Sequence, residues 1–312
     1  MPMTQEPLIA IVGPTAVGKT ALGIELAKTF GAEIISGDSM QVYRTMDIGT
    51  AKATVEEMAG IPHHLIDILE PGDTWTVSLF QEKALLAIAS IRSRGKWPLL
   101  VGGTGLYVQA LTHELSFGAA SSDPSFREEM ELYANRFGNA ALHEKLAIAD
   151  PKAAEAIHAN NVRRVIRALE VIHLTGKPFS EQENGLARPR FDNVLIGLEM
   201  ERQALYERIN RRVDAMMEAG LLEEVHRLYQ RGIQGQAIQA IGYKELYAYF
   251  DGKCTCDEAI EALKTNSRRY AKRQLTWFKN RSDAVWFNLE EPEAKAKIFD
   301  YVHAFLAGKG FA

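Results

Sequence analysis

The chain has 312 residues, 46% of them hydrophobic, so it can bury a sizeable core in one large or two modest domains. Its formal net charge of −4, from 36 Lys and Arg against 40 Asp and Glu, does not by itself indicate a nucleic-acid partner. No apolar run reaches about 18 residues, and no basic segment precedes an apolar one at the start, which argues against a membrane span or a secretory signal. We therefore expect a soluble, cytoplasmic protein with no membrane partner.

The first motif along the chain is a phosphate-binding loop, IVGPTAVGKT at 11–20. The pattern Gly13-x-x-x-x-Gly18-Lys19-Thr20 follows an apolar run and precedes a helical pattern, which is the setting in which backbone N–H groups wrap a polyphosphate. In such a loop the lysine places its charge on the terminal phosphate groups, and the threonine hydroxyl is a ligand of Mg²⁺.

The first part of the chain alternates strand-like and helical patterns. The strand-like runs are Leu8–Val12, Glu33–Ser36, Leu65–Leu69 and Pro98–Val101, and the clearest helical pattern covers Val77–Ser93. This order predicts an α/β fold with a parallel sheet and helices on both faces. The polar clusters at 36–41 and 102–105 follow strand-like runs, so both are expected to open onto the same crevice as the P-loop.

Beyond about Ser121 the pattern becomes helical, with helices expected from the SSDP segment onward and at 139–148, 151–157 and 161–174. A strand-like run returns at 194–199. Helical patterns follow at 202–219, 221–231 and 257–278, then a short AVWFNL run and a terminal helix. We therefore expect a P-loop NTPase-like α/β catalytic core at 1–119 and 196–312, interrupted by an all-helical insertion domain at 120–195.

The chemistry of the phosphate-binding loop stays open on these patterns. ATP- and other nucleotide-binding P-loop enzymes have an acidic residue at a strand end, but WPLLVGGTG ends in glycines. The nearest carboxylate at a strand end is Asp38, which could order a metal or accept a proton from a nucleophile. Phosphoryl transfer and the use of a diphosphate as a leaving group from carbon both fit.

A local basic segment stands out against the acidic average. Residues 262–281, ALKTNSRRYAKRQLTWFKNR, carry seven Lys and Arg residues and no acidic one. Such a density is a candidate footprint for a nucleic-acid backbone, because each cation that neutralises a phosphate releases a counterion.

Several motifs together resemble the tRNA dimethylallyltransferase (isopentenyltransferase) family over most of the chain. These are GPTAVGKT, EIISGDSMQVYRTMDIGTAK, VGGTGLY, HANNVRRVIRALEV, YERINRRVDAMMEAGLLEEV, QAIGYKEL and KRQLTWF. The resemblance implies transfer of a dimethylallyl group from dimethylallyl diphosphate to N6 of the adenosine at position 37, beside the tRNA anticodon, with release of pyrophosphate. The sequence shows no Cys/His pair of a zinc-finger tail, so we expect the bacterial type.

The resemblance also assigns the donor site. It implies that the diphosphate lies on Gly13, Thr15, Ala16, Val17, Gly18, Lys19, Thr20 and Arg208. Lys19 then contacts its oxygens, Thr20 binds Mg²⁺, and Arg212 is the arginine that grips the departing pyrophosphate. Asp38 is the base that accepts a proton from N6 as it attacks. Thr104 contacts the reacting groups, although an ordinary helix N-cap is the alternative for this residue.

Recognition of the acceptor is assigned to the residues beside Asp38. Gln41 has the amide edge that hydrogen-bonds adenine, and the base must leave its stack to reach the site. The implied contacts to the anticodon stem-loop of tRNA are Asp38, Ser39, Met40, Gln41, Thr104, Arg127, Arg163, Arg164, Arg167, Gln239, Gly242, Lys244, Arg268, Lys272, Arg273 and Gln274. Salt bridges to Glu170 are the alternative for the arginines near 163–167. We expect a monomer.

Three other functions stay open on the sequence. A small-molecule kinase or NTPase would turn over ATP or GTP and be indifferent to RNA. An adenylate isopentenyltransferase would use free AMP, although the helical insertion and the basic segment argue against so small an acceptor. An RNA-binding module could hold a nucleotide as a switch. The paired His63 and His64 are interpreted as structural, and Cys254 and Cys256 as free thiols.

Overall fold

The computed structural model describes residues 6–114, 123–181 and 188–309. The chain divides into two compact units, Met1–His113 with Pro189–Ala312, and Glu114–Arg188. The expected domain border at 119/120 lies outside the described residues. The other expected border, 195/196, falls inside the strand Asp192–Glu199 rather than before it. The larger unit is therefore built from both ends of the chain, and the smaller unit is inserted between them.

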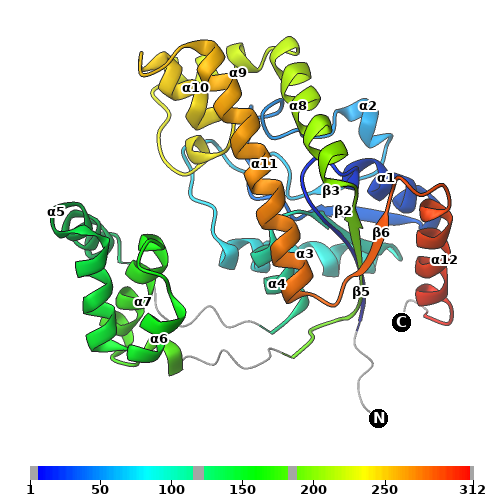
Figure 1. Cartoon of the computed structure of the whole chain (residues 1–312). Helices are drawn as coiled ribbons and strands as arrows, with labels where there is room; N and C mark the ends of the chain where they lie inside the picture. Colours follow the sequence, from blue (N-terminus) through cyan, green and yellow to red (C-terminus); the bar gives the residue numbers. More distant parts are fainter. Residues whose placement is uncertain (1–5, 115–122, 182–187, 310–312) are drawn as a thin grey trace. The chain divides into compact units, whose positions relative to one another are not determined.

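The larger unit contains a six-stranded sheet (Figure 1) in the order β3-β2-β4-β1-β5-β6. Its strands are β1 (Pro7–Val12), β2 (Ala32–Ser36), β3 (His63–His64), β4 (Trp97–Gly102), β5 (Asp192–Glu199) and β6 (Val285–Asn288). Every neighbouring pair is parallel. The expected α/β fold with a P-loop NTPase-like parallel sheet is confirmed.

Successive residues of β1 pack against different layers of helices. Leu8, Ala10 and Val12 belong to the same buried cluster as residues of α3 (Val77–Ser93) and α4 (Gly105–Thr112). Ile9 and Ile11 belong to the cluster that contains α1 (Lys19–Phe30) and α12 (Ala294–Leu306). Figure 1 shows these two helix pairs on opposite sides of the sheet. Both faces are thus covered, as a parallel sheet requires.

The remaining helices of the larger unit are α2 (Val55–Met58), α8 (Arg202–Glu218), α9 (Leu221–Gln230), α10 (Tyr243–Phe250) and α11 (Cys256–Arg281). A short 3₁₀ turn covers Ala237–Gln239. Helix α11 begins at a capping box, in which the Thr255 side chain accepts from the Glu258 amide and the Glu258 carboxylate accepts from the Thr255 amide. Within the described residues, no helix is long and apolar enough to cross a membrane.

The inserted unit is helical throughout its described part. It contains α5 (Pro124–Ala149), α6 (Pro151–Ala156), α7 (Val162–Thr175) and a 3₁₀ turn at Phe179–Glu181. Helix α5 is kinked at Gly138, whose φ of 86° only glycine adopts readily. Apolar residues from α5, α6 and α7 form a core of their own.

The strand expected at Leu65–Leu69 was wrong. Only His63 and His64 pair with β2, and the chain then leaves the extended conformation, since φ is 64° at Leu65 and 54° at Asp67. The mostly apolar run LIDIL at 65–69 suggested a strand, but the left-handed conformations turn the backbone out of the sheet. This turn brings Asp67 toward the site described below.

Candidate active site

The phosphate-binding loop joins β1 to α1 at the carboxyl end of the sheet. A Cβ at Gly13 would lie 2.6 Å from the Leu198 carbonyl oxygen, so no side chain fits there. Gly18 is the N-cap of α1 with φ of 109° and provides no side-chain cap. The first turn of α1 also contains no acidic residue. Its N–H groups and the positive end of the helix dipole are therefore available to an anion.

Lys19, the first residue of α1, is held over the loop, where its Nζ donates to the Pro14 carbonyl oxygen at 2.6 Å. Burial and, to a smaller extent, the positive charge of Arg212 lower the pKa of Lys19 to about 7, although the negative charge of Asp38 acts in the opposite direction. A bound diphosphate would raise this pKa again, because an opposite charge favours the protonated amine. The neighbouring Thr20 is exposed and lines the same cleft.

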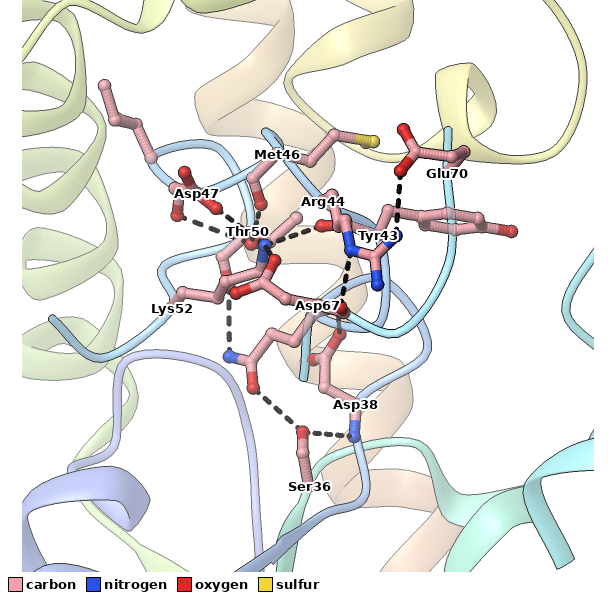
Figure 2. Close-up of polar contacts among 12 residues, drawn as sticks. Ser36, Asp38, Tyr43, Arg44, Met46, Asp47, Thr50, Lys52, Asp67 and Glu70 are labelled. Carbon is pink, nitrogen blue, oxygen red and sulfur yellow. Dashed lines mark hydrogen bonds and ion pairs between the residues drawn. The ribbon is translucent and has the colours of Figure 1, made fainter. Parts of the chain in front are cut away.

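Asp38 follows β2 and lies beside the P-loop. Its Oδ1 accepts from the backbone N–H groups of Met40 at 2.8 Å and Gln41 at 3.4 Å, and its own N–H donates to Ser36 Oγ at 3.4 Å (Figure 2). Among the described residues, none makes a hydrogen bond to Oδ2. One oxygen thus fixes the carboxylate in a local turn, and the other is available to a ligand.

Helix α8 places three arginines along the cleft. Arg208, Arg211 and Arg212 all line it, and Arg212 is half-buried while Arg208 is exposed. Burial lowers the pKa of Arg212, the charge of Asp38 raises it, and the charge of Arg208 lowers it. This cluster of positive charge suits a polyanion. The choice of Arg212 over Arg208 as the main diphosphate ligand stays a prediction.

Gln274 of α11 joins two loops of the site. Its Oε1 accepts from the Thr15 N–H at 2.8 Å, and its Nε2 donates to the Gly103 carbonyl oxygen at 2.9 Å. The residue is only 5% exposed. Gln274 therefore connects the P-loop to the glycine-rich turn after β4, a role that the sequence analysis did not foresee. A contact with tRNA, as expected there, stays a prediction.

Thr104 ends the glycine-rich turn and occupies the N-cap position of α4. Its side chain makes no capping hydrogen bond, and its buried Oγ1 faces the Tyr270 side chain without a hydrogen bond of good geometry. Thr104 thus occupies the N-cap position, as the alternative predicted, but its side chain does not cap the helix. Tyr270 faces the same region: burial raises its pKa to about 12, and the Asp38 charge acts in the same direction. Tyr270 was not predicted as a site residue, although it lies one turn before Gln274 on α11.

Two cavities meet at Asp38. The larger, of about 1320 Å³, is lined by the P-loop and the arginines of α8. The smaller, of about 320 Å³, is lined by Ser39, Met40, Gln239 and Lys244 among others. Both are also lined by Asp38, Arg212 and Tyr270, which therefore stand at their junction. Gln41 lines the larger cavity near this junction.

The residues of α11 that were predicted to contact tRNA differ in their surroundings: one is engaged in hydrogen bonds within the protein, and others are exposed. Arg268 donates to Asn210 Oδ1 at 2.6 Å and to Thr265 Oγ1 at 2.9 Å. Lys272 and Arg273 are exposed, with the Arg273 guanidinium 5.7 Å from the centre of the Tyr270 ring. Gly242, with φ of 103°, is the N-cap of α10. All of these residues stay predicted tRNA contacts.

The inserted unit contains the other predicted contacts. Arg127 binds the two Glu170 oxygens at 2.7 and 2.8 Å, and Arg167 binds one at 2.6 Å. Burial raises the pKa of Glu170, but the hydrogen bonds from these arginines outweigh it and hold the pKa below its usual value. The salt-bridge alternative therefore describes Arg167, and Arg127 pairs with the same carboxylate, a contact that was not predicted. Arg163 and Arg164 are exposed, with no ion pair to a described residue.

The histidine pair and the cysteines occupy structural positions. His64 Nε2 lies 2.7 Å from the Glu33 carboxylate, and His63 Nδ1 lies 2.8 Å from the Ile61 carbonyl oxygen. Cys254 and Cys256 are free thiols. No three His, Cys, Asp or Glu side chains form a metal-binding group in the part of the chain that the structure describes.

Comparisons with known proteins agree on one family. The family model described as IPP transferase matches residues 41–281, and the isopentenyl transferase model matches residues 6–68. The chain is 97% identical to a tRNA dimethylallyltransferase of Shouchella clausii over 310 residues, which are 99% of this chain and 100% of the relative.

Solved structures give the same result. A full-length tRNA isopentenylpyrophosphate transferase from Bacillus halodurans matches with a TM-score of 0.74 and 53% identity, over 97% of each chain. A eukaryotic dimethylallyltransferase acting on tRNA matches with a TM-score of 0.81 and 30% identity, over 97% of this chain and 79% of the other.

Proposed function

Because the chain belongs to the tRNA dimethylallyltransferase (IPP transferase) family, we propose how its site performs the reaction of that family. The protein is a prenyltransferase that transfers a dimethylallyl group to tRNA. Dimethylallyl diphosphate is the donor, N6 of the adenosine at position 37 is the acceptor, and pyrophosphate is released. The observation that carries this proposal is the position of Asp38 at the junction of two cavities, one built for an anion.

The larger cavity holds the donor. The N–H groups of the P-loop and the start of α1 surround the diphosphate, and Lys19 and Arg212 place positive charge on it, with Arg208 at the exposed side. In the transition state, negative charge grows on the leaving oxygen as the bond to carbon breaks. Fixed donors in a partly buried site stabilise this charge more than water does.

Mg²⁺ fits the donor end of this cavity. Thr20 lines it with an exposed side chain beside Lys19. Mg²⁺ binds few protein ligands and takes most of its oxygen ligands from phosphate and water. When bound, Mg²⁺ neutralises part of the charge of the diphosphate. Thr20 is the protein ligand in this proposal.

The smaller cavity receives the adenine. Its amine is a poor nucleophile, because the nitrogen lone pair is delocalised into the ring. The free Oδ2 of Asp38 orients N6 and accepts its proton as the new C–N bond forms. As N6 bonds to the first carbon of the prenyl group, the C–O bond of the donor breaks and its electron pair leaves with pyrophosphate. Ser39 and Met40 line this cavity, and Gln41 meets the extruded base from the larger cavity. The base is easier to unstack in a loop than in a duplex.

The remaining assignments concern the RNA. We propose that the inserted unit and the basic face of α11 bind the anticodon stem-loop. Arg163, Arg164, Lys272 and Arg273 are the candidates whose side chains are most exposed to a phosphate backbone. Arg127 and Arg167 both bind Glu170 within the inserted unit, and they stay proposed RNA contacts of that unit. The expected monomeric state and cytoplasmic location stay predictions.

Transfer of radiolabel from dimethylallyl diphosphate tests this function. The protein is incubated with labelled donor, Mg²⁺, unmodified tRNA and the free nucleotides AMP, ATP and GTP. A matched tRNA in which guanosine replaces adenosine 37 is the control. The proposal predicts label in the first RNA and none in the second. Label in free AMP alone, hydrolysis of ATP or GTP without labelled RNA, or RNA binding without transfer would each identify one of the other three functions.

A further inference from the structure

The Gln41 carboxamide is held in one orientation. Ser36 Oγ donates to its Oε1 at 2.8 Å, and its Nε2 donates to the carbonyl oxygens of Thr50 at 3.3 Å and Ala51 at 3.4 Å. A carbonyl oxygen can only accept, so the opposite flip would set Oε1 against two other acceptors. The orientation of Gln41 therefore depends on where the segment 46–52 places these two carbonyls.

Glu224 of α9 holds the first half of this segment. Its carboxylate is buried, at 3% exposure, and accepts from the backbone N–H groups of Asp47 at 2.9 Å, Ile48 at 2.8 Å and Gly49 at 3.1 Å. The Tyr243 hydroxyl donates to the same carboxylate at 2.6 Å. Charge-assisted hydrogen bonds of this kind are stronger than neutral ones. One carboxylate thus fixes three consecutive amides.

Lys52 holds the second half. Its side chain is 5% exposed, and its Nζ donates to the Tyr43 carbonyl oxygen at 2.6 Å, to Asp47 Oδ1 at 2.6 Å and to Asp67 Oδ1 at 2.5 Å (Figure 2). An ammonium group has three donors, and the protein takes all three. Lys52 therefore has no proton left for a phosphate, although it lines the donor cavity. Its contacts pin the turn next to the carbonyls that Gln41 uses.

We propose that Lys52 and Glu224 are positioning residues for acceptor specificity, because they fix the turn that sets the flip of the Gln41 carboxamide. In this orientation the remaining lone pair of Oε1 accepts from the 6-amino group of adenine. The same lone pair repels the 6-oxo group of hypoxanthine or guanine. The inference rests on the proposed function, because it assumes that Gln41 faces the extruded base.

Equilibrium binding of two RNA hairpins tests this role. Both are anticodon stem-loops, one with adenosine and one with inosine at position 37, and binding is measured with Mg²⁺ and inorganic pyrophosphate present. For the wild-type protein we expect the inosine hairpin to bind roughly tenfold more weakly, from the loss of one base-edge contact. In Lys52→Met and in Glu224→Gln the ratio of the affinity for the adenosine hairpin to that for the inosine hairpin falls toward one, while the affinity for pyrophosphate is unchanged. A purely structural role would lower the active fraction for both hairpins and leave the ratio as it was.

A double-mutant cycle then separates positioning from an indirect effect. In a Gln41→Ala background, Lys52→Met changes the ratio no further, because the side chain that it positions is gone. Lys295→Met removes an exposed lysine that pairs with Glu25 and serves as the control with a wild-type ratio. If Lys52→Met does not fold, Asp67→Asn removes one partner of Lys52 and is expected to shift the ratio less, in the same direction.

The inference is overturned if both single variants keep the wild-type ratio, if Lys52→Met changes the ratio equally without Gln41, or if the wild-type protein binds the two hairpins equally. Radiolabel transfer by the wild-type protein is measured alongside. When label reaches the tRNA but the ratio does not depend on Lys52 or Glu224, only this inference fails. When no label reaches the tRNA, the proposed function fails first.

Discussion

Replacing Asp38 by asparagine isolates its role as a base. The Oδ1 of Asp38 accepts from the Met40 and Gln41 amides, and an asparagine oxygen can make the same two contacts. The local turn is thus expected to persist while the proton acceptor is lost. A positioned general base contributes about 10² to 10⁴ in rate, so the barrier to the chemical step should rise by about 3 to 5 kcal/mol.

Single-turnover label transfer with saturating donor and tRNA measures that step. Removing the Asp38 charge also lowers the pKa of Lys19, because Asp38 raises it in the wild-type protein. Saturating diphosphate compensates, since its own charge keeps the lysine protonated. Asp38→Ala is the companion variant. It removes Oδ1 as well, so it should weaken tRNA binding in addition to lowering the rate of transfer. A single-turnover rate within tenfold of wild type in Asp38→Asn, or normal chemistry with lost RNA binding, would refute the assignment.

Three further predictions follow from other contacts. Lys19, with a pKa of about 7 in the free protein, should take up a proton when pyrophosphate binds above pH 7. The affinity for pyrophosphate should then fall by up to about tenfold for each unit by which the pH rises above 7. Calorimetry in buffers of different ionisation enthalpy measures the proton uptake, and no uptake would contradict the prediction. Gln274→Leu leaves a P-loop amide and a turn carbonyl unpaired, so denaturant unfolding should show a loss of about 1–3 kcal/mol for each group together with a higher donor KM, and an unchanged KM would contradict its role. Neutralising Arg268 and Arg273 should reduce the slope of log K for tRNA against log salt by about 0.7 to 0.9 per lost contact, whereas Lys295→Ala should not, and an unchanged slope would move the RNA footprint elsewhere.

The local parts of the site could be predicted from the sequence. The P-loop depends on a few neighbouring residues, since Gly13 and Gly18 adopt conformations or approaches that only glycine allows. The place of Asp38 in the site could be predicted because it comes soon after β2, and the carboxyl ends of parallel strands share one edge of the sheet. Short-range constraints of this kind are visible in the order of the residues.

Contacts between distant segments could not be predicted in the same way. Gln274 reaches Thr15 across 259 positions of the sequence, and Glu224 reaches the turn at 47–49 across 175 to 177 positions. In the sequence Gln274 is one polar residue in a basic helix, so it was assigned to RNA. The wrong prediction of a strand at 65–69 has a related cause. Leu65 and Asp67 adopt left-handed backbone conformations, which are usually indicated by a glycine in the sequence, and neither residue is a glycine.

The central claim is that the P-loop holds the diphosphate of a prenyl donor so that an extruded adenine displaces it at carbon. A crystal structure with a thiodiphosphate analogue of the donor, Mg²⁺ and an anticodon stem-loop tests this most directly. We expect the diphosphate on the P-loop, N6 about 3 to 3.5 Å from the first carbon of the prenyl group, and Asp38 within hydrogen-bond distance of N6. A nucleoside triphosphate that displaces the analogue from the P-loop, with its terminal phosphorus facing an acceptor hydroxyl, would contradict it.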